Sequence, residues 1–399
     1  MQPFVPRLEP ESTQRMTLAQ HAMQRILSSR AWRWSSPLRG AVKRLAPVRY
    51  ASAKLSILRS ESTRFDPARH LPRLFLSTGV SRLCNYRCTH CHIWTQRDPE
   101  NGLTTDQRVD VIHQYAALNP KGRVIFPGGE VTMDMPELLA LAAACRQHRL
   151  DCHINTNGSS VTTIERAREL VQSGITSIEI SLDSHLPEIH RYTRGIETAY
   201  EDTLRAIRLL VSARDRWQKD VQLAVGCVVF DQNIRLLPDY IDFTRALGVD
   251  HATFQILSPT FANRHPDRDV FWKQHFFHTA EAKAEACRLL DEVVRRYSDG
   301  FLSKRPGDLE WIKRYVMDPT SSTGMQMCGS HEKNMVIDSR GNVALCFNQA
   351  DVLPDEPRVG HVLQQSLRQL WMGESSARAR DVMNQCRLAC GALDCHRRS

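Results

Sequence analysis

The chain has 399 residues, 42% of them hydrophobic and 24% charged, which is typical of a globular protein large enough for more than one domain. No stretch is apolar enough to cross a bilayer, and Pro3, Arg7 and Glu9 interrupt the start, so neither a membrane span nor a signal peptide is expected. The net charge of +9 belongs to residues 1–70, which hold thirteen Lys or Arg against four Asp or Glu, whereas the remaining chain holds forty of each. Because the body is neutral, we expect no nucleic-acid partner.

The N-terminal extension, residues 1–70, is predicted to be basic and partly helical. Residues 12–60 contain no acidic side chain, and Trp32 and Trp34 follow a run of apolar residues at helical spacing, namely Met16, Ala19, Met23, Ile26 and Leu27. Such a segment binds an anionic membrane surface or a partner, targets a protein to an organelle, or packs on its own protein. The sequence leaves these alternatives open, and we expect a cytoplasmic protein with peripheral membrane contact as one alternative.

From residue 71 to residue 300, strand-like runs alternate with helical patterns. The predicted strands are 73–79, 123–128, 151–155, 176–182, 221–230 and 251–257, and the predicted helices lie near 104–118, 136–149, 161–173, 198–214, 235–247 and 279–297. This alternation predicts an α/β fold with a parallel sheet, either doubly wound or curled towards a barrel. In both cases the loops that leave the C-terminal ends of the strands build the active site.

Residues 301–399 are predicted to form a second, smaller module. A β-hairpin is expected over 334–346 with Gly341 in the turn, followed by a helical stretch over 366–385. The chain then ends in a cysteine-rich segment, CRLACGALDCHRRS.

Three cysteines, Cys84, Cys88 and Cys91, follow the first predicted strand within the segment SRLCNYRCTHCHIW. Without an export signal they are expected in a reducing compartment, where clustered cysteines favour metal or redox chemistry over disulfides. Zinc would take a fourth ligand from His90 or His92, whereas an iron–sulfur cube on three thiolates would leave one iron open. Spacing alone does not decide between them.

The second strand ends in FPGGEVT, which contains Gly128, Gly129 and Glu130. Two glycines let the backbone approach a bound molecule closely, and the glutamate suits an ammonium group. Alone, the motif is also compatible with a tight turn before a helix.

The third and fourth strands end in INTNG and ISLDS. Asn157, Ser181 and Asp183 offer hydrogen bonds suited to ribose hydroxyls or a carboxylate, although each also suits a cap or a turn.

Taken in this order, the loops resemble those of radical S-adenosylmethionine (SAM) enzymes, and the resemblance covers roughly residues 72–300. It implies a partial (β/α)6 barrel in which Cys84, Cys88 and Cys91 bind a [4Fe–4S] cluster whose open iron chelates SAM. The residues that it implies around SAM are His90 against the adenine, Gly128, Gly129 and Glu130 at the methionyl amino group, Ser181 and Asp183 at the ribose or carboxylate, and Arg194 in HRYTRG at the carboxylate. Val131 stands where many relatives have proline.

The C-terminal cysteines resemble those of SPASM and twitch extensions, in which a hairpin cysteine pair joins later cysteines around an auxiliary [4Fe–4S] cluster. Five cysteines are present, so one auxiliary cluster is expected, with structural zinc as the alternative. The expected ligands are Cys328, Cys346 and Cys386, with Cys390 or Cys395 as the fourth.

The resemblance implies an enzyme that cleaves SAM to a 5′-deoxyadenosyl radical and takes hydrogen from a substrate, for net oxidation or rearrangement of a small molecule or sugar. It requires an external electron donor of the flavodoxin or ferredoxin type. The alternatives are a maturase of ribosomally made peptides, an enzyme of lipid or lipid-linked substrates, and, from another class, a zinc-stabilised binding protein. No residue is singled out as the proton acceptor, and the substrate is not identified.

Overall fold

The computed structural model describes residues 65–96, 101–259, 269–304, 306–319 and 329–386. The chain divides into two compact units, residues 1–66 and 67–399, and the second unit is described below. The predicted N-terminal helix and its tryptophans lie outside the described residues, as do Cys328, Cys390 and Cys395. None of the described helices is long and apolar enough to cross a membrane.

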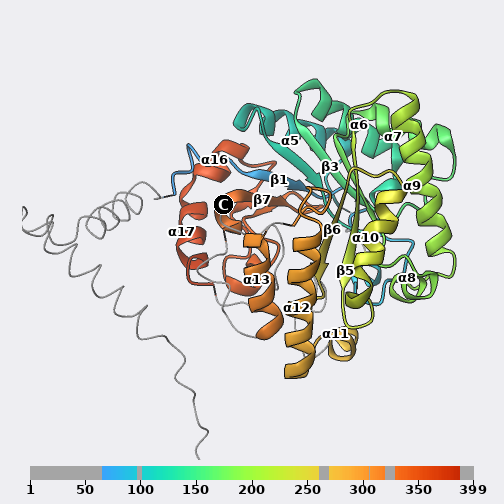
Figure 1. Ribbon diagram of the computed structural model, residues 1–399. Coiled ribbons are helices and arrows are strands. Elements are labelled where there is room, and N and C mark those ends of the chain that lie inside the picture. Colours follow the sequence, from blue (N-terminus) through green and yellow to red (C-terminus); the bar gives the residue numbers. More distant parts are fainter. Residues whose placement is uncertain (1–64, 97–100, 260–268, 305, 320–328, 387–399) are drawn as a thin grey trace, which may run out of the picture. The chain divides into compact units, whose positions relative to one another are not determined.

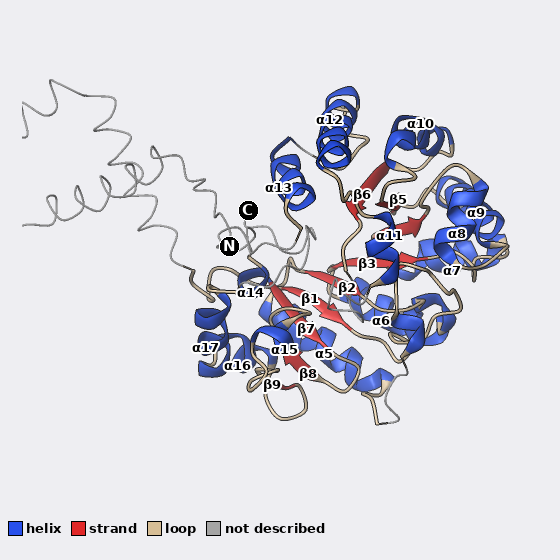
Figure 2. Ribbon diagram, turned by 90° about the horizontal axis from the view of Figure 1, so that it is seen from below, coloured by secondary structure: helices blue, strands red, loops and turns tan. Residues whose placement is uncertain are grey.

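Six parallel strands form the first part of the sheet and confirm the predicted strands to within a few residues. They are β1 (Arg73–Leu76), β2 (Arg123–Phe126), β3 (Asp151–Thr156), β4 (Ser177–Ser181), β5 (Gln222–Val229) and β6 (His251–Ile256). Each pairs with its neighbour in chain order. The strands form a curved, open sheet with α5, α6, α7, α9 and α10 along its outer side (Figure 2). The expected partial barrel is therefore confirmed.

The helices of this part are α5 (Thr105–Leu118), α6 (Met135–Gln147), α7 (Ile164–Ser173), α8 (Pro187–Arg194), α9 (Ala199–Arg216), α10 (Leu237–Ala246), α11 (Val270–His275), α12 (Ala280–Arg296) and α13 (Pro306–Met317), with 3-10 turns η1 (Ile93–Thr95), η2 (Val131–Met133) and η3 (Ile234–Leu236). Three short or late helices, α8, α11 and α13, were not predicted. Helix α8 has only eight residues and ends at Gly195, which adopts φ 64°, so its pattern is too short to show a helical period.

The C-terminal strands extend the same sheet (Figure 1). They are β7 (Asn334–Ile337), β8 (Asn342–Ala344) and β9 (Gly360–His361), and β7 pairs in parallel with β1. The resulting order is β6-β5-β4-β3-β2-β1-β7-β8-β9. The remaining helices are α14 (Ser330–Lys333), α15 (Gln349–Val352), α16 (Leu367–Met372) and α17 (Glu374–Met383). The predicted helix over 366–385 is thus two helices, and the division into three domains stays a prediction.

A buried ion pair joins the start of the cysteine loop to the C-terminal hairpin. Arg108 on α5 lies 3.0 Å from the carboxylate of Glu137 on α6, and their side chains are 3% and 5% exposed. Glu137 accepts a hydrogen bond of 2.8 Å from the backbone of Gly79, while Arg108 donates to the carbonyls of Ser77 and Ser339. Ser77 and Gly79 follow β1, and Ser339 lies in the β7–β8 turn, so one pair fixes both segments.

Candidate active site

A cavity of about 1130 Å³ lies at the C-terminal ends of the strands. It is lined by the three loop cysteines Cys84, Cys88 and Cys91 together with His90, Gly128, Gly129, Glu130, Asn157, Ser181 and Arg194. The structure therefore brings together every described residue predicted for the first site except Asp183. This volume lies slightly above the usual range of about 300–1,000 Å³ for ligand pockets.

The three loop thiols lie close enough together that each raises the pKa of another. Burial is the largest cause, and it raises the pKa of Cys88 and of Cys91 to about 11. Thiols in such a position are neutral at pH 7 unless a metal centre supplies positive charge. The donor set thus fits a thiolate-bound metal centre, and three thiolates match a cluster with one open iron.

The two glycines of FPGGE allow two loops to pack against each other. The backbone N–H of Gly129 donates to the carbonyl of Ser81 at 2.6 Å, and that of Glu130 donates to Leu83 at 2.8 Å. A Cβ on Gly129 would lie 1.7 Å from the Leu83 oxygen, and a Cβ on Gly128, at φ 138°, would lie 2.4 Å from the Ser81 oxygen. The glycines therefore hold the cysteine loop, and because both also line the cavity, their predicted approach to a bound molecule stays a prediction.

The Glu130 carboxylate is held by its own surroundings and is 1% exposed. Its Oε1 accepts from the hydroxyls of Thr132 and Thr156, the latter at 2.7 Å, and Oε2 accepts from the backbone N–H of Asn157 at 2.7 Å. Burial raises the pKa of Glu130, and these donors oppose that shift. Oε2 keeps capacity for a further donor, such as an ammonium group.

Asn157 connects the end of β3 to the cysteine loop. Its side-chain Nδ2 donates to Asn85 Oδ1 at 2.9 Å, and its Oδ1 accepts from the hydroxyl of Ser159 at 2.6 Å. Asn85 in turn donates to Ser159 Oγ at 2.7 Å and lies directly after Cys84. Asn85 and Ser159 were not predicted, since isolated polar residues in a loop carry no periodic pattern.

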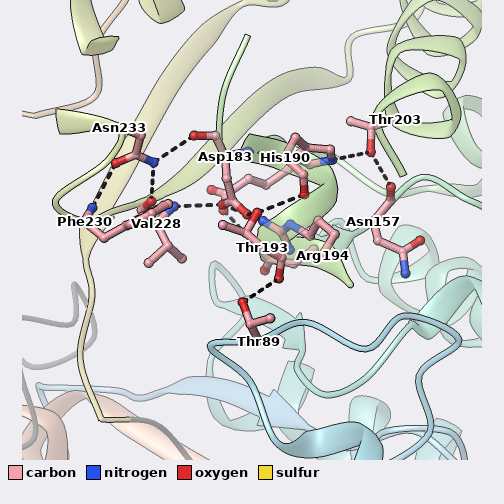
Figure 3. Close-up of polar contacts among 12 residues, drawn as sticks. Thr89, Asn157, Asp183, His190, Thr193, Arg194, Thr203, Val228, Phe230 and Asn233 are labelled. Atoms are coloured by element: carbon pink, nitrogen blue, oxygen red, sulfur yellow. Dashed lines mark hydrogen bonds and ion pairs between the residues drawn. The ribbon is translucent and has the colours of Figure 1, made fainter. Parts of the chain in front are cut away.

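Asp183 does not line the cavity, and its side chain lies beside Thr193 and Arg194 (Figure 3). Its carboxylate accepts from Arg194 Nη2 and from the Thr193 hydroxyl, both at 2.7 Å, and from the Val228 backbone at 3.1 Å. Although burial alone would raise it, the Arg194 guanidinium holds the pKa of Asp183 well below its usual value. These bonds show that Asp183 orients Arg194, and the direct contact with a ligand that the sequence predicts stays a prediction.

His190 extends this network towards Asn157. The backbone N–H of Asp183 donates to His190 Nδ1 at 3.0 Å, which leaves the proton on Nε2, 3.3 Å from the Thr203 hydroxyl. Thr203 then donates to the Asn157 carbonyl at 3.0 Å (Figure 3). Burial lowers the pKa of His190 to about 3, so this ring is neutral and keeps one tautomer.

The segment Thr193–Gly195 also holds the cysteine loop. The backbone N–H of Thr89 donates to the Thr193 carbonyl at 2.9 Å, and that of Arg87 donates to the Arg194 carbonyl at 3.2 Å. A Cβ on Gly195 would lie 2.2 Å from the Arg87 oxygen. The loop is therefore clamped between two backbone segments, and the Arg194 guanidinium lies beside the Cys88 thiol.

His90 and Ser181 lie on the remaining walls. His90 is 8% exposed, and its ring centroid lies 6.0 Å from that of Phe271 on α11. Burial lowers the pKa of His90 to about 4, so the imidazole is neutral. Ser181 ends β4 opposite Gly226 of β5 and lines the cavity.

Cys346 lines the same cavity from the C-terminal side. It is buried, and its Sγ accepts a hydrogen bond of 3.3 Å from the backbone N–H of Asn348, which is the kind of bond that stabilises a metal-bound thiolate. Cys386 follows α17 and is half-buried.

Two side chains of α14 form hydrogen bonds with residues next to Cys346 and Cys386. The Ser330 hydroxyl donates to the carbonyl of Leu345 at 3.3 Å, one residue before Cys346. His331 Nε2 lies 3.0 Å from Asn384 Oδ1, two residues before Cys386. The expected ligands Cys328, Cys390 and Cys395 lie outside the described residues, so that set stays a prediction.

Comparison with known families shows two matches. Residues 79–216 match the radical SAM superfamily, and residues 328–396 match the SPASM family, an iron–sulfur cluster-binding domain. These matches confirm the cofactors expected from the sequence, a [4Fe–4S] cluster with SAM and a further iron–sulfur cluster, and they set aside the zinc-stabilised binding protein.

Curated relatives share part of the chain. Mycofactocin maturase MftC of Mycolicibacterium smegmatis is 29% identical over 274 residues, which are 68% of this chain and 63% of that protein. AdoMet-dependent heme synthase of Oleidesulfovibrio alaskensis is 28% identical over 185 residues, 45% of each chain. The chain spans 39% to 52% of the length of the heme synthases and the Fe-coproporphyrin III synthase that it matches.

Solved structures share the fold. Streptococcus suis SuiB bound to S-adenosylmethionine has a TM-score of 0.57 and 13% identity, over 88% of this chain and 80% of that one. Native anSMEcpe with bound AdoMet has a TM-score of 0.56 and 18% identity, over 77% and 82%. On the strength of the two family matches, the chain is a radical SAM enzyme with a SPASM-type C-terminal module.

Proposed function

We propose that Cys84, Cys88 and Cys91 hold the SAM-binding cluster and that the enzyme oxidises its substrate by hydrogen abstraction. When bound, the cluster and SAM supply a 5′-deoxyadenosyl radical, which takes a hydrogen atom from the substrate. The chain's own task is to orient SAM, position one substrate carbon and keep water out.

The walls of the cavity present complementary groups to a zwitterionic nucleoside. Glu130 supplies a fixed negative charge for the methionyl ammonium, and Arg194, oriented by Asp183, supplies a fixed positive charge for the carboxylate. His90 offers a neutral ring to the adenine, while Ser181 and Asn157 offer hydrogen bonds to the ribose. Because these groups are held by buried neighbours, they need little reorganisation on binding.

One observation supports an oxidation: the loop cysteines and Cys346 line the same cavity. A substrate between them lies next to the radical source on one side and next to a second iron–sulfur cluster on the other. Cys346 would help to hold that second cluster, which would supply an electron acceptor for the net two-electron oxidation of a substrate. The wall near Cys346 contains Asn342, Asn348, Gln349 and Arg358, which suits a polar substrate.

Deuterium transfer tests this proposal without a known substrate. The reconstituted enzyme, SAM and dithionite are incubated with small-molecule and peptide fractions of extracts from cells grown on deuterated medium. The proposal predicts singly deuterated 5′-deoxyadenosine in the fraction that contains the substrate. Deuterium-free 5′-deoxyadenosine in every fraction, together with no increase in its yield, would count against hydrogen abstraction from a cellular metabolite or peptide.

A peptide is the second candidate substrate. The match to Mycofactocin maturase MftC covers 68% of this chain, against 41% to 47% for the heme-related relatives. The extracts above distinguish the two, because deuterium would come from the peptide fraction alone. Lipid-linked substrates and membrane contact rest on residues 1–70, of which 1–64 lie outside the described residues, and they stay predictions.

A further inference from the structure

We propose that Arg358 binds an oxyanion of the substrate, either a carboxylate or a phosphate, an inference that rests on the proposed function. Arg358 lies in the C-terminal wall of the cavity, which also contains Cys346. The next residue, Val359, donates its backbone N–H to the Val343 carbonyl on β8 at 2.7 Å. The backbone beside Arg358 is therefore fixed to the hairpin, while the Arg358 side chain is exposed and within reach of a ligand.

Two neighbouring side chains orient the Arg358 guanidinium. Asp338 Oδ2 accepts a hydrogen bond from Asn342 Nδ2 at 2.8 Å. Because an ionised carboxylate only accepts, this bond fixes which end of the Asn342 amide is the oxygen, and Arg358 Nη1 donates to that Oδ1. Asp338 and Asn342 also line the cavity, so a neutral amide holds the guanidinium at the cavity wall.

This hydrogen bond orients Arg358 without neutralising its charge. Two other arginines of the cavity lie close to carboxylates. Arg194 lies 2.7 Å from Asp183, and Arg378 lies 3.6 Å from Glu356. By contrast, within the described part of the chain no carboxylate oxygen lies within 4.0 Å of the Arg358 guanidinium. The cavity wall therefore presents a positive charge that a bound anion can neutralise.

The donors left on this guanidinium match an oxyanion. Nε and Nη2 of Arg358 form no hydrogen bond to any residue that the structure describes. Side by side, these two groups match two oxygens of a carboxylate or a phosphate. Asp355 also lines the cavity and would repel further anionic groups, so we expect one oxyanion at Arg358 and not several along this wall.

An oxyanion held at Arg358 also makes this residue a determinant of specificity. The rest of the substrate would extend from the C-terminal wall towards Cys84, Cys88 and Cys91, which line the same cavity. A site that pairs with a charged group discriminates strongly against an analogue that lacks it, because its own charge is then left without a partner.

Arginine modification tests the oxyanion site without a known substrate. The cluster-loaded full chain with SAM is treated with phenylglyoxal, and peptide mass spectrometry measures the modified fraction of each arginine as inorganic phosphate or acetate is added. The control is Arg368 on α16, which is exposed and does not line the cavity. The proposal predicts that one of the two anions half-protects Arg358 at a concentration about tenfold or more below that for Arg368. Equal protection of both arginines by both anions would overturn it.

The deuterated extracts test the same contact with the substrate itself. Each fraction that yields deuterated 5′-deoxyadenosine is assayed untreated, after esterification of carboxylates and phosphates, and after alkaline phosphatase. The proposal predicts that esterification abolishes deuterium transfer. Loss with phosphatase as well identifies a phosphate monoester, whereas transfer that persists after phosphatase identifies a carboxylate or a phosphate diester. Transfer that survives esterification would overturn the proposal.

Variants connect this effect to Arg358. Arg358→Gln should raise the amount of untreated extract needed for half-maximal deuterium transfer about tenfold or more, because a charge-assisted contact is lost. Arg358→Lys, which keeps the charge but not the paired donors, should recover part of the loss, and Arg368→Gln should keep the wild-type value. An unchanged requirement in Arg358→Gln would overturn the proposal. Absence of deuterium transfer from every extract with the wild type would instead contradict the proposed function, and the protection experiment would still decide the oxyanion site.

Discussion

Replacing Arg108 by methionine should strongly destabilise the fold, because it leaves the Glu137 carboxylate buried without its cation. The two side chains are 3% and 5% exposed and lie 3.0 Å apart, and Arg108 also donates to the Ser77 carbonyl. Removing one partner of a buried pair costs about 3–5 kcal/mol. With a urea dependence of about 3 kcal/mol per molar, the unfolding midpoint should fall by roughly 1–1.7 M.

The matched control is Arg166→Met on α7. Arg166 and Glu169 lie 3.3 Å apart, but their side chains are 49% and 42% exposed. Such a pair contributes less than about 1 kcal/mol, so the midpoint should hardly move. Urea unfolding followed by circular dichroism measures both variants. If Arg108→Met lost no more stability than Arg166→Met, the assignment of Arg108 and Glu137 as the link between the cysteine loop and the hairpin would be refuted.

Three further variants test the site. Gly129→Ala should prevent stable cluster incorporation, since the added Cβ would lie 1.7 Å from the Leu83 oxygen. The control is Gly307→Ala on α13, where an added Cβ meets nothing within 4 Å, and it should bind iron normally. Equal iron contents in the two variants would contradict the proposed packing of Gly129 against the cysteine loop. Asp183→Asn should weaken SAM binding at least about tenfold in equilibrium dialysis, because the neutral amide no longer fixes the Arg194 guanidinium, which lines the cavity. A wild-type Kd for SAM would argue against this orienting role of Asp183. Cys346→Ala should lower the iron content from about eight to about four iron atoms per chain, while dithionite-driven SAM cleavage persists. An unchanged iron content would exclude Cys346 as a ligand.

Local patterns were sufficient to predict the repeating part of the fold. The six parallel strands and their main helices begin and end within a few residues of the predicted positions, because short apolar runs bounded by turn residues alternate with longer helical segments. The pairing of β1 with β7 was not predicted, since residues such as Arg73 and Asn334 are far apart in sequence and periodicity carries no information about distant partners.

The sequence predicted which residues belong to the site more accurately than it predicted the contacts that these residues make. Eleven of the expected residues line one cavity, yet Asp183 faces Arg194 and Gly129 faces Leu83. The sequence shows that an acid and a glycine follow particular strands, but the direction of a side chain depends on neighbouring loops. The clamp around the cysteine loop therefore emerges only from the assembled structure.

The central claim is that the loop cysteines Cys84, Cys88 and Cys91 hold a cluster that cleaves SAM. Anaerobically reconstituted full chain and a variant with all three cysteines changed to alanine are incubated with SAM and dithionite, and 5′-deoxyadenosine is quantified by mass spectrometry. The account predicts 5′-deoxyadenosine from the wild type and none above background from the variant. Equal yields from both, or none from an iron-loaded wild type, would contradict it.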